Sequence, residues 1–190
     1  MKMEKYINRY INDVKENVSI LDVGTGSGRD MIFGQSLGYN FFGVDNCEGF
    51  IELLSKHASE GLINENSFKH CDMRLLDFPN NTFDVVRHNA SLLHLPLIGK
   101  NYTLDLALSE ANRVLKQRGL LYILVKFGNG LEVHDTGEKL GGRIFQFFNH
   151  RTLNEVVTRN DFTILFTSDL VELRGDTIID WILLIAQKNS

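Results

Sequence analysis

The chain has 190 residues, of which 43% are hydrophobic, and its formal net charge is −4. This length suits a single domain over residues 1–190, and the apolar content excludes a disordered chain. No long basic run is present, so nucleic acid is not an expected partner. The N-terminus lacks an apolar signal core and no stretch is long enough to span a bilayer, so we expect a cytoplasmic protein with no membrane partner.

Strands and helices are expected to alternate along the chain. Apolar residues at helical spacing predict a first amphipathic helix over residues 3–16. The predicted elements that follow are strand 18–23, helix 29–37, strand 40–45, helix 48–57, strand 67–71, strand 83–88, helix 104–115, strand 120–127, helix 152–160, and strands 162–171 and 177–187. Thr152 is the predicted cap of the last helix.

This order of elements predicts an α/β domain with a mainly parallel sheet. The turn at residues 174–176 indicates that the last two strands form an antiparallel hairpin. Residues 128–150 are predicted to be a long loop, and loops of this length in compact domains are usually functional. Cys47 and Cys71 do not form a Cys-x-x-Cys pair, so neither a metal site nor a redox pair is expected.

The most informative segment covers residues 20–30, where an apolar strand ends at Asp22 and is followed by Gly24, Gly26 and Gly28. Glycine is needed where backbone turns sharply or lies against a ligand, because it has no Cβ. Since a helix follows at once, the segment predicts a nucleotide-type pocket at the carboxyl end of a parallel strand. The third glycine falls one residue too early for the dinucleotide fingerprint Gly-x-Gly-x-x-Gly, which argues against a nicotinamide oxidoreductase.

The pattern Asp-x-Gly-x-Gly-x-Gly at residues 22–28 resembles the first motif of class I S-adenosylmethionine-dependent methyltransferases. Residues 83–95 resemble the fourth motif of this family, and residues 126–128 and 142–145 are similar to segments of a group of small bacterial members. The resemblance covers nearly the whole chain. It implies a doubly wound, Rossmann-like, seven-stranded and mostly parallel sheet with a C-terminal antiparallel hairpin. It also implies S-adenosyl-L-methionine as the cofactor.

Further residues are expected at this cofactor. Asp45 closes the second strand, 17 residues after Gly28, where a carboxylate can accept hydrogen bonds from both ribose hydroxyls; the alternative is an acid at the start of the next helix. The resemblance implies that Asp72 accepts from the adenine amine and that Met73 lies against the ring, whereas composition alone favours a solvated acid beside a core methionine. The expected cofactor-binding residues are Asp22, Gly24, Thr25, Gly26, Gly28, Asp45, Asn46, Asp72, Met73, His88 and Asn89.

His88, His94 and Lys126 are the candidates for catalysis. Histidine titrates near neutrality and can remove a proton from the acceptor, and His88 ends a strand on the ligand edge of the sheet. Both histidines also fit a purely structural role. Arg87 and His88 stand where the family more often has small or apolar residues, so the shape and charge of the acceptor pocket are expected to differ.

The loop over residues 128–150 is rich in charge. It is either solvated surface or a lid over the acceptor. In the second case Lys126, His134 and Arg143 are the expected substrate-binding residues, because cations there can bind a carboxylate or a phosphate.

These observations predict methyl transfer from S-adenosylmethionine to a small-molecule acceptor, an anionic one among the options. The reaction is expected to be an in-line displacement that depends on positioning, with a histidine as the candidate general base. Two alternatives stay open, namely methylation of a protein or RNA and a non-catalytic scaffold that binds the cofactor. The lack of a basic patch and of an appended domain disfavours a macromolecular acceptor.

Overall fold

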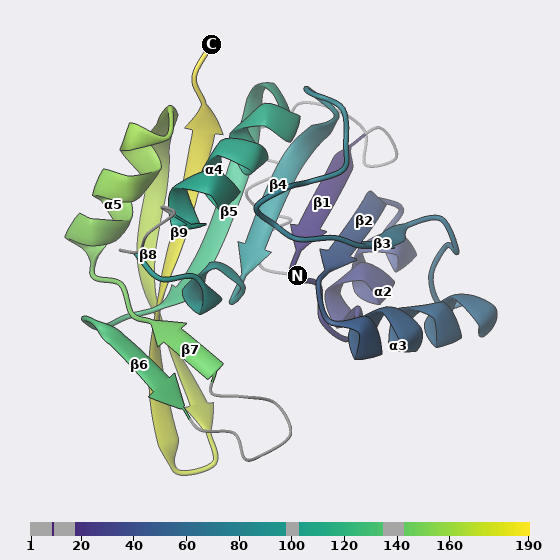
Figure 1. Ribbon diagram of the computed structural model, residues 1–190, viewed down its shortest axis with the longest axis horizontal. Coiled ribbons are helices and arrows are strands. Elements are labelled where there is room, and N and C mark those ends of the chain that lie inside the picture. Colours follow the sequence, from purple (N-terminus) through teal and green to yellow (C-terminus); the bar gives the residue numbers. More distant parts are fainter. Residues whose placement is uncertain (1–8, 10–17, 98–102, 135–142) are drawn as a thin grey trace.

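The computed structural model describes residue 9 and residues 18–97, 103–134 and 143–190. Within these residues, seven strands form one sheet in the order β3-β2-β1-β4-β5-β9-β8 (Figure 1). The strands are β1 (Ser19–Val23), β2 (Asn40–Asp45), β3 (Phe68–His70), β4 (Phe83–Asn89), β5 (Leu115–Lys126), β8 (Phe162–Arg174) and β9 (Thr177–Lys188). The pairs among β1 to β5 are parallel, whereas β9 runs antiparallel to both β5 and β8. The predicted mostly parallel sheet with a C-terminal hairpin is therefore confirmed.

Helices cover both faces of the sheet. They are α2 (Arg29–Ser36), α3 (Glu48–Ser59), α4 (Thr103–Val114) and α5 (His150–Arg159), with a short 3-10 turn η2 (Leu92–His94) after β4. One core contains side chains of α2 and α3, and the other contains side chains of α4 and α5. Successive strand residues point to opposite faces, so Val85 belongs to the first core and Val86 to the second. Both faces of β1, β4 and β5 are thus buried, as expected for central parallel strands.

The carboxyl ends of β1, β2 and β4 lie together at one edge of the sheet, the lower edge in Figure 1. The loops that follow these strands meet there, because parallel strands with helical crossovers place every such loop on the same side. A small second sheet lies at the same edge, formed by β6 (Leu131–His134) and β7 (Arg143–Gln146) in antiparallel pairing. This edge is where a ligand site is expected.

The structure differs most clearly from the predicted elements at three places. The loop over 128–150 contains β6 and β7, strands of four residues that are too short to give a clear alternation signal. Strand β5 begins at Leu115, five residues before its predicted start, and Leu115 pairs with Phe83. Helix α5 begins at His150 with Asn149 as its cap, and Thr152 donates its backbone N–H to the Asn149 side chain.

Two other predictions concern residues that lie wholly or partly outside the described part of the chain. The first predicted helix, over residues 3–16, lies outside this part except for residue 9. The expected lid over residues 128–150 includes residues 135–142, which also lie outside it, and the lid stays a prediction. In the part of the chain that the structure describes, none of the helices combines the length and the apolar character needed to cross a membrane.

Candidate active site

The loop between β1 and α2 has a backbone that glycine adopts most easily. Gly24, Gly26 and Gly28 have φ angles of 76°, 57° and 74°. A Cβ on Gly24 would lie 2.4 Å from Ser91 Cβ, and a Cβ on Gly28 would lie 2.3 Å from Leu54 Cδ2. At Gly26, by contrast, no atom comes closer than 4.0 Å to a Cβ. Gly24 and Gly28 therefore allow neighbouring elements to pack closely, whereas Gly26 leaves open space.

A cavity of about 540 Å³ lies beside this loop, and we call it the glycine-loop cavity. Its volume falls within the range of roughly 300–1,000 Å³ that is typical of small-molecule sites. Predicted site residues that line it are Gly24, Gly26, Asp45, Asn46, Asp72, Met73 and His94. The cavity is also lined by residues that the sequence did not indicate, namely Cys47, Phe50, Arg74, Ala90, Ser91, Leu95 and Ile144. Several of these residues directly follow a predicted site residue in the sequence. This proximity was the only feature of the sequence that could have indicated that they line the cavity.

Asp45 stands at the end of β2 with its carboxylate fixed in the cavity wall. Its Oδ2 accepts the backbone N–H of Gly26 at 2.9 Å, and its Oδ1 accepts that of Cys47 at 3.0 Å. The residue is 9% exposed. Each oxygen retains a lone pair, because a carboxylate offers about four acceptor sites in total. The side chain is therefore held in place with capacity for a further ligand.

Asp72 lies on the same cavity wall, after β3. Its Oδ1 accepts the backbone N–H of Arg74 at 2.8 Å and the side-chain Nε–H of Arg74 at 3.0 Å. The Arg74 hydrogen bond lowers the pKa of Asp72, so the carboxylate stays ionised and can only accept. Met73 lines the wall beside it and packs partly against the core.

A buried ion-pair network lies behind the glycine loop. Arg87 of β4 donates from Nη1 to Asp22 Oδ1 at 2.7 Å and from Nη2 to the carboxylate of Asp30. Thr25 Oγ1 donates to the other oxygen of Asp22 at 3.0 Å. Burial raises the pKa of Asp22, although the charge of Arg87 acts in the opposite direction. The network joins β1, β4 and α2, and it holds the glycine loop in position on the side that faces the protein interior.

This arrangement departs from part of the prediction for the loop. Asp22, Thr25 and Gly28 were expected to contact the cofactor, but they do not line the cavity. Asp22 is 2% exposed and turned toward Arg87, and Thr25 is turned toward Asp22. These residues support the loop, and Gly28 packs against α3 through Leu54.

The position of His88 also departs from the prediction. Its side chain is fully buried, and its Nδ1 lies 3.2 Å from Ser91 Oγ. Burial lowers the pKa of His88 to about 3, so the imidazole is neutral at physiological pH. Strand residues alternate between faces, so His88 points away from the side that Arg87 and Asn89 occupy. His88 is absent from the lining of the glycine-loop cavity in the described structure, so its predicted roles as a base and as a cofactor contact stay predictions.

His94 lies in η2 and lines the glycine-loop cavity. Its Nδ1 lies 2.9 Å from the carbonyl oxygen of Ile144. A carbonyl can only accept, so Nδ1 carries the proton of this hydrogen bond. The imidazole also packs edge-on against Phe145, with ring centroids 5.0 Å apart. His94 therefore fastens β7 to the rim of the cavity.

The remaining predicted substrate residues lie around β7. The ammonium of Lys126 sits 4.3 Å from the centroid of the Phe145 ring, a cation–π distance. Lys126 does not line the glycine-loop cavity in the described structure. His134 and Arg143 are paired across the β6–β7 hairpin. Their side chains lie outside the described part of the chain.

A second cavity of about 480 Å³ adjoins the first, and we call it the Trp181 cavity. Ala90, directly after β4, lines both cavities. Its φ of 59° lies in the left-handed region, which is uncommon for a residue other than glycine.

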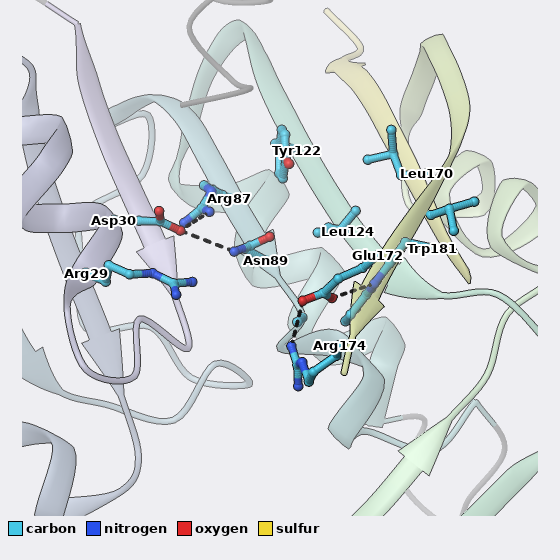
Figure 2. A pocket seen from close by; sticks show the side chains of 12 residues that line it. Arg29, Asp30, Arg87, Asn89, Tyr122, Leu124, Leu170, Glu172, Arg174 and Trp181 are labelled. Atoms are coloured by element: carbon cyan, nitrogen blue, oxygen red, sulfur yellow. Dashed lines mark hydrogen bonds and ion pairs between the residues drawn. The ribbon is translucent and has the colours of Figure 1, made fainter. Parts of the chain in front are cut away.

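Figure 2 shows the walls of the Trp181 cavity: Arg29, Asp30, Arg87 and Asn89 on one side, and Tyr122, Leu124, Leu170, Glu172, Arg174 and Trp181 on the other. The Asn89 side chain donates to Asp30 at 3.2 Å, and its predicted contact with the cofactor stays a prediction.

Residues 21–123, more than half of the chain, match the family model described as a methyltransferase domain. The chain belongs to this methyltransferase family. An S-adenosylmethionine-dependent methyltransferase from Methanosarcina mazei matches this methyltransferase domain with a TM-score of 0.81 and 25% identity, over 97% of each chain. The 1,6-didemethyltoxoflavin-N1-methyltransferase of Burkholderia thailandensis, solved with S-adenosylhomocysteine, matches with a TM-score of 0.70 and 18% identity, over 100% of this chain and 88% of that one.

Among curated proteins, the phosphoethanolamine N-methyltransferase of Plasmodium falciparum (isolate 3D7) is 30% identical over 90 residues. The match covers 47% of this methyltransferase chain and 33% of the relative, so the chain spans about a third of the length of the curated relatives it matches.

S-adenosylmethionine is the cofactor of this family, and the glycine-loop cavity of the methyltransferase domain fits it. Asp45 presents a fixed carboxylate with free acceptor capacity, and the backbone at Gly26 leaves room for a ligand. Both residues line a cavity of suitable volume at the carboxyl edge of the sheet.

Proposed function

We propose that the protein transfers a methyl group from S-adenosylmethionine to a small-molecule acceptor. The observation that carries this proposal is the carboxylate of Asp45, which two backbone N–H groups fix in the wall of a cavity that Gly26 keeps open. When bound, S-adenosylmethionine supplies an activated methyl group on a sulfonium. The names of two matched proteins, which refer to phosphoethanolamine and didemethyltoxoflavin, support a small acceptor. Two adjoining cavities of small-molecule size support it as well.

The cofactor-binding roles follow from the cavity wall. Asp45 accepts hydrogen bonds from the two ribose hydroxyls, for which its remaining lone pairs are available. Asp72 accepts from the adenine amine, and Met73 contacts the ring with its polarisable thioether. Asn46, beside Asp45, completes this part of the wall.

The protein's contribution to the reaction is mainly positioning. An in-line displacement needs the nucleophile within about 3–3.5 Å of the methyl carbon, in a site with little water. Ala90 stands where the two cavities meet, so this junction is where both reactants come together. Of the three residues predicted for catalysis, His94 is the one that lines a described cavity, and we propose it as the base where the acceptor must lose a proton.

Isothermal titration with S-adenosylhomocysteine tests the proposal. We expect wild-type protein to bind and Asp45→Asn to bind roughly tenfold more weakly or worse, because a charge-assisted hydrogen bond is lost. Asp176→Asn is the matched control, since Asp176 is exposed in the turn between β8 and β9 and should bind like wild type. No heat from wild-type protein with either S-adenosylmethionine or S-adenosylhomocysteine would refute the proposed function.

A further inference from the structure

The Trp181 cavity has no role in the cofactor site described above, yet it opens beside it at Ala90. Transfer requires the acceptor to occupy space that is continuous with the cofactor cavity. The left-handed conformation of Ala90 is unfavourable by about 1 kcal/mol or more for a residue with a Cβ. The hydrogen bond from its N–H to the carbonyl oxygen of Leu124, at 2.9 Å, helps to hold this conformation. Strained backbone that the surrounding structure maintains is concentrated at functional sites.

One wall of this cavity is suited to an apolar body. Leu124 of β5, Leu170 of β8 and Trp181 of β9 line it, and Leu170 pairs directly with Trp181 in the sheet. The indole N–H of Trp181 donates to Glu172 at 3.0 Å, so the polar edge of the indole is already satisfied. Trp181 as a whole residue is 8% exposed. These side chains offer apolar contact to a ring-sized group.

The opposite wall contains the guanidinium of Arg29, which forms no hydrogen bond with an acid among the described residues. Three arginines line the cavity: Arg87 is paired with two carboxylates, and Arg174 donates to Glu172 at 3.0 Å. Arg29 makes no hydrogen bond or ion pair with any residue that the structure describes. The hydrogen bond from Arg174 is the main cause of the lowered pKa of Glu172, and the charge of Arg29 makes a smaller contribution in the same direction. Figure 2 shows the Arg29 side chain at the start of α2, across the cavity from Glu172 and Arg174.

The charges around Arg29 also determine which anionic group of an acceptor could bind there. A guanidinium presents a planar set of donors that matches a carboxylate. Asp30 and Glu172 line the same cavity, so a doubly charged phosphate would meet two negative groups. A singly charged carboxylate therefore suits this space better than a phosphate dianion.

We propose that the Trp181 cavity is the methyl-acceptor site and that it takes a compact carboxylic acid with an apolar, ring-sized body, whose carboxylate binds Arg29. This inference rests on the proposed function, because it needs the methyl group to arrive at Ala90. In this proposal the carboxylate of the acceptor binds Arg29 and not Lys126, the cation that the sequence predicted for substrate binding. The ammonium of Lys126 lies over the Phe145 ring.

The chain offers a reporter for the test, because Trp181 is its single tryptophan. Phenylacetate and its neutral counterpart phenylacetamide are titrated into protein with and without saturating S-adenosylhomocysteine, and the indole fluorescence is followed. We expect a saturable change with phenylacetate and roughly tenfold weaker binding of phenylacetamide. Arg29→Ala should reduce this preference to about twofold or less. Arg151→Ala, which changes an exposed arginine on α5, should leave it intact.

Three outcomes would overturn the inference: no saturable change with phenylacetate, equal affinity for phenylacetamide, or an unchanged preference in Arg29→Ala. Calorimetry with S-adenosylhomocysteine on the same samples separates the two proposals. Binding of S-adenosylhomocysteine without phenylacetate binding removes the acceptor site alone. If Arg29→Ala weakens S-adenosylhomocysteine and leaves the phenylacetate preference intact, Arg29 serves the cofactor and the inference falls. Failure of S-adenosylhomocysteine to bind removes the proposed function, while the titration without it still decides whether this cavity takes a carboxylate.

Discussion

Replacing Gly26 by alanine separates the two uses of glycine in the loop after β1. The backbone at Gly26 has a φ of 57°, so a Cβ adds strain of about 1–2 kcal/mol to the folded state. The nearest atom to that Cβ is Cε2 of Phe50 at 4.0 Å, so the methyl group creates no clash in the protein. Gly26 and Phe50 both line the glycine-loop cavity, and the methyl group would therefore occupy space that the cofactor needs.

Gly61→Ala is the matched control for this substitution. Gly61 has a φ of 73°, no atom lies within 4 Å of its Cβ position, and it does not line the cavity. We expect both variants to lose a similar free energy of unfolding, about 1–2 kcal/mol in urea titrations. Only Gly26→Ala should also bind S-adenosylhomocysteine at least about tenfold more weakly, a loss of about 1.4 kcal/mol by calorimetry. Wild-type affinity in Gly26→Ala, or an equal loss in Gly61→Ala, would refute the reasoning.

Two further predictions concern the buried charges and histidine of β4. Burial lowers the pKa of His88 from 6.5 to about 3, so its contribution to stability is complete above pH 6.5 and is lost as the pH falls toward 3. This residue alone should lower the free energy of unfolding by about 2 kcal/mol between about pH 7 and about pH 5, and His88→Gln should flatten the urea-derived pH profile by that amount; an unchanged slope would contradict it. Arg87→Met leaves the carboxylate of Asp22 buried without its cation, and we expect a loss of about 3–5 kcal/mol in urea unfolding. The double variant Asp22→Asn, Arg87→Met should recover part of this loss. A loss below about 1 kcal/mol in Arg87→Met would show that the Asp22–Arg87 ion pair does not stabilise the loop.

The parts of the site that the sequence predicted depend on neighbouring residues. The alternation of glycines after Asp22 and the acid at Asp45 each lie at the end of a predicted strand. The carboxyl ends of parallel strands meet at one edge, so these local signals determine where the residues gather. Asp45 and Gly26 do meet there, joined by a hydrogen bond of 2.9 Å.

The parts that the sequence did not predict depend on long-range packing. Arg87 stood out as unusual for the family, but its partner Asp22 lies 65 positions away, and the sequence does not indicate this pairing. The direction of His88 depends on which face of β4 each residue occupies, and both faces of that strand are buried and apolar. The Trp181 cavity combines the start of α2 with β5, β8 and β9, which no local motif connects.

A crystal structure with S-adenosylhomocysteine would show whether the glycine-loop cavity is the cofactor site. We expect the nucleoside in the glycine-loop cavity, with its ribose hydroxyls on the carboxylate of Asp45, its adenine beside Asp72 and Met73, and its sulfur directed toward Ala90. Electron density for the ligand at another place, or a glycine-loop cavity that stays empty at saturating ligand, would contradict it.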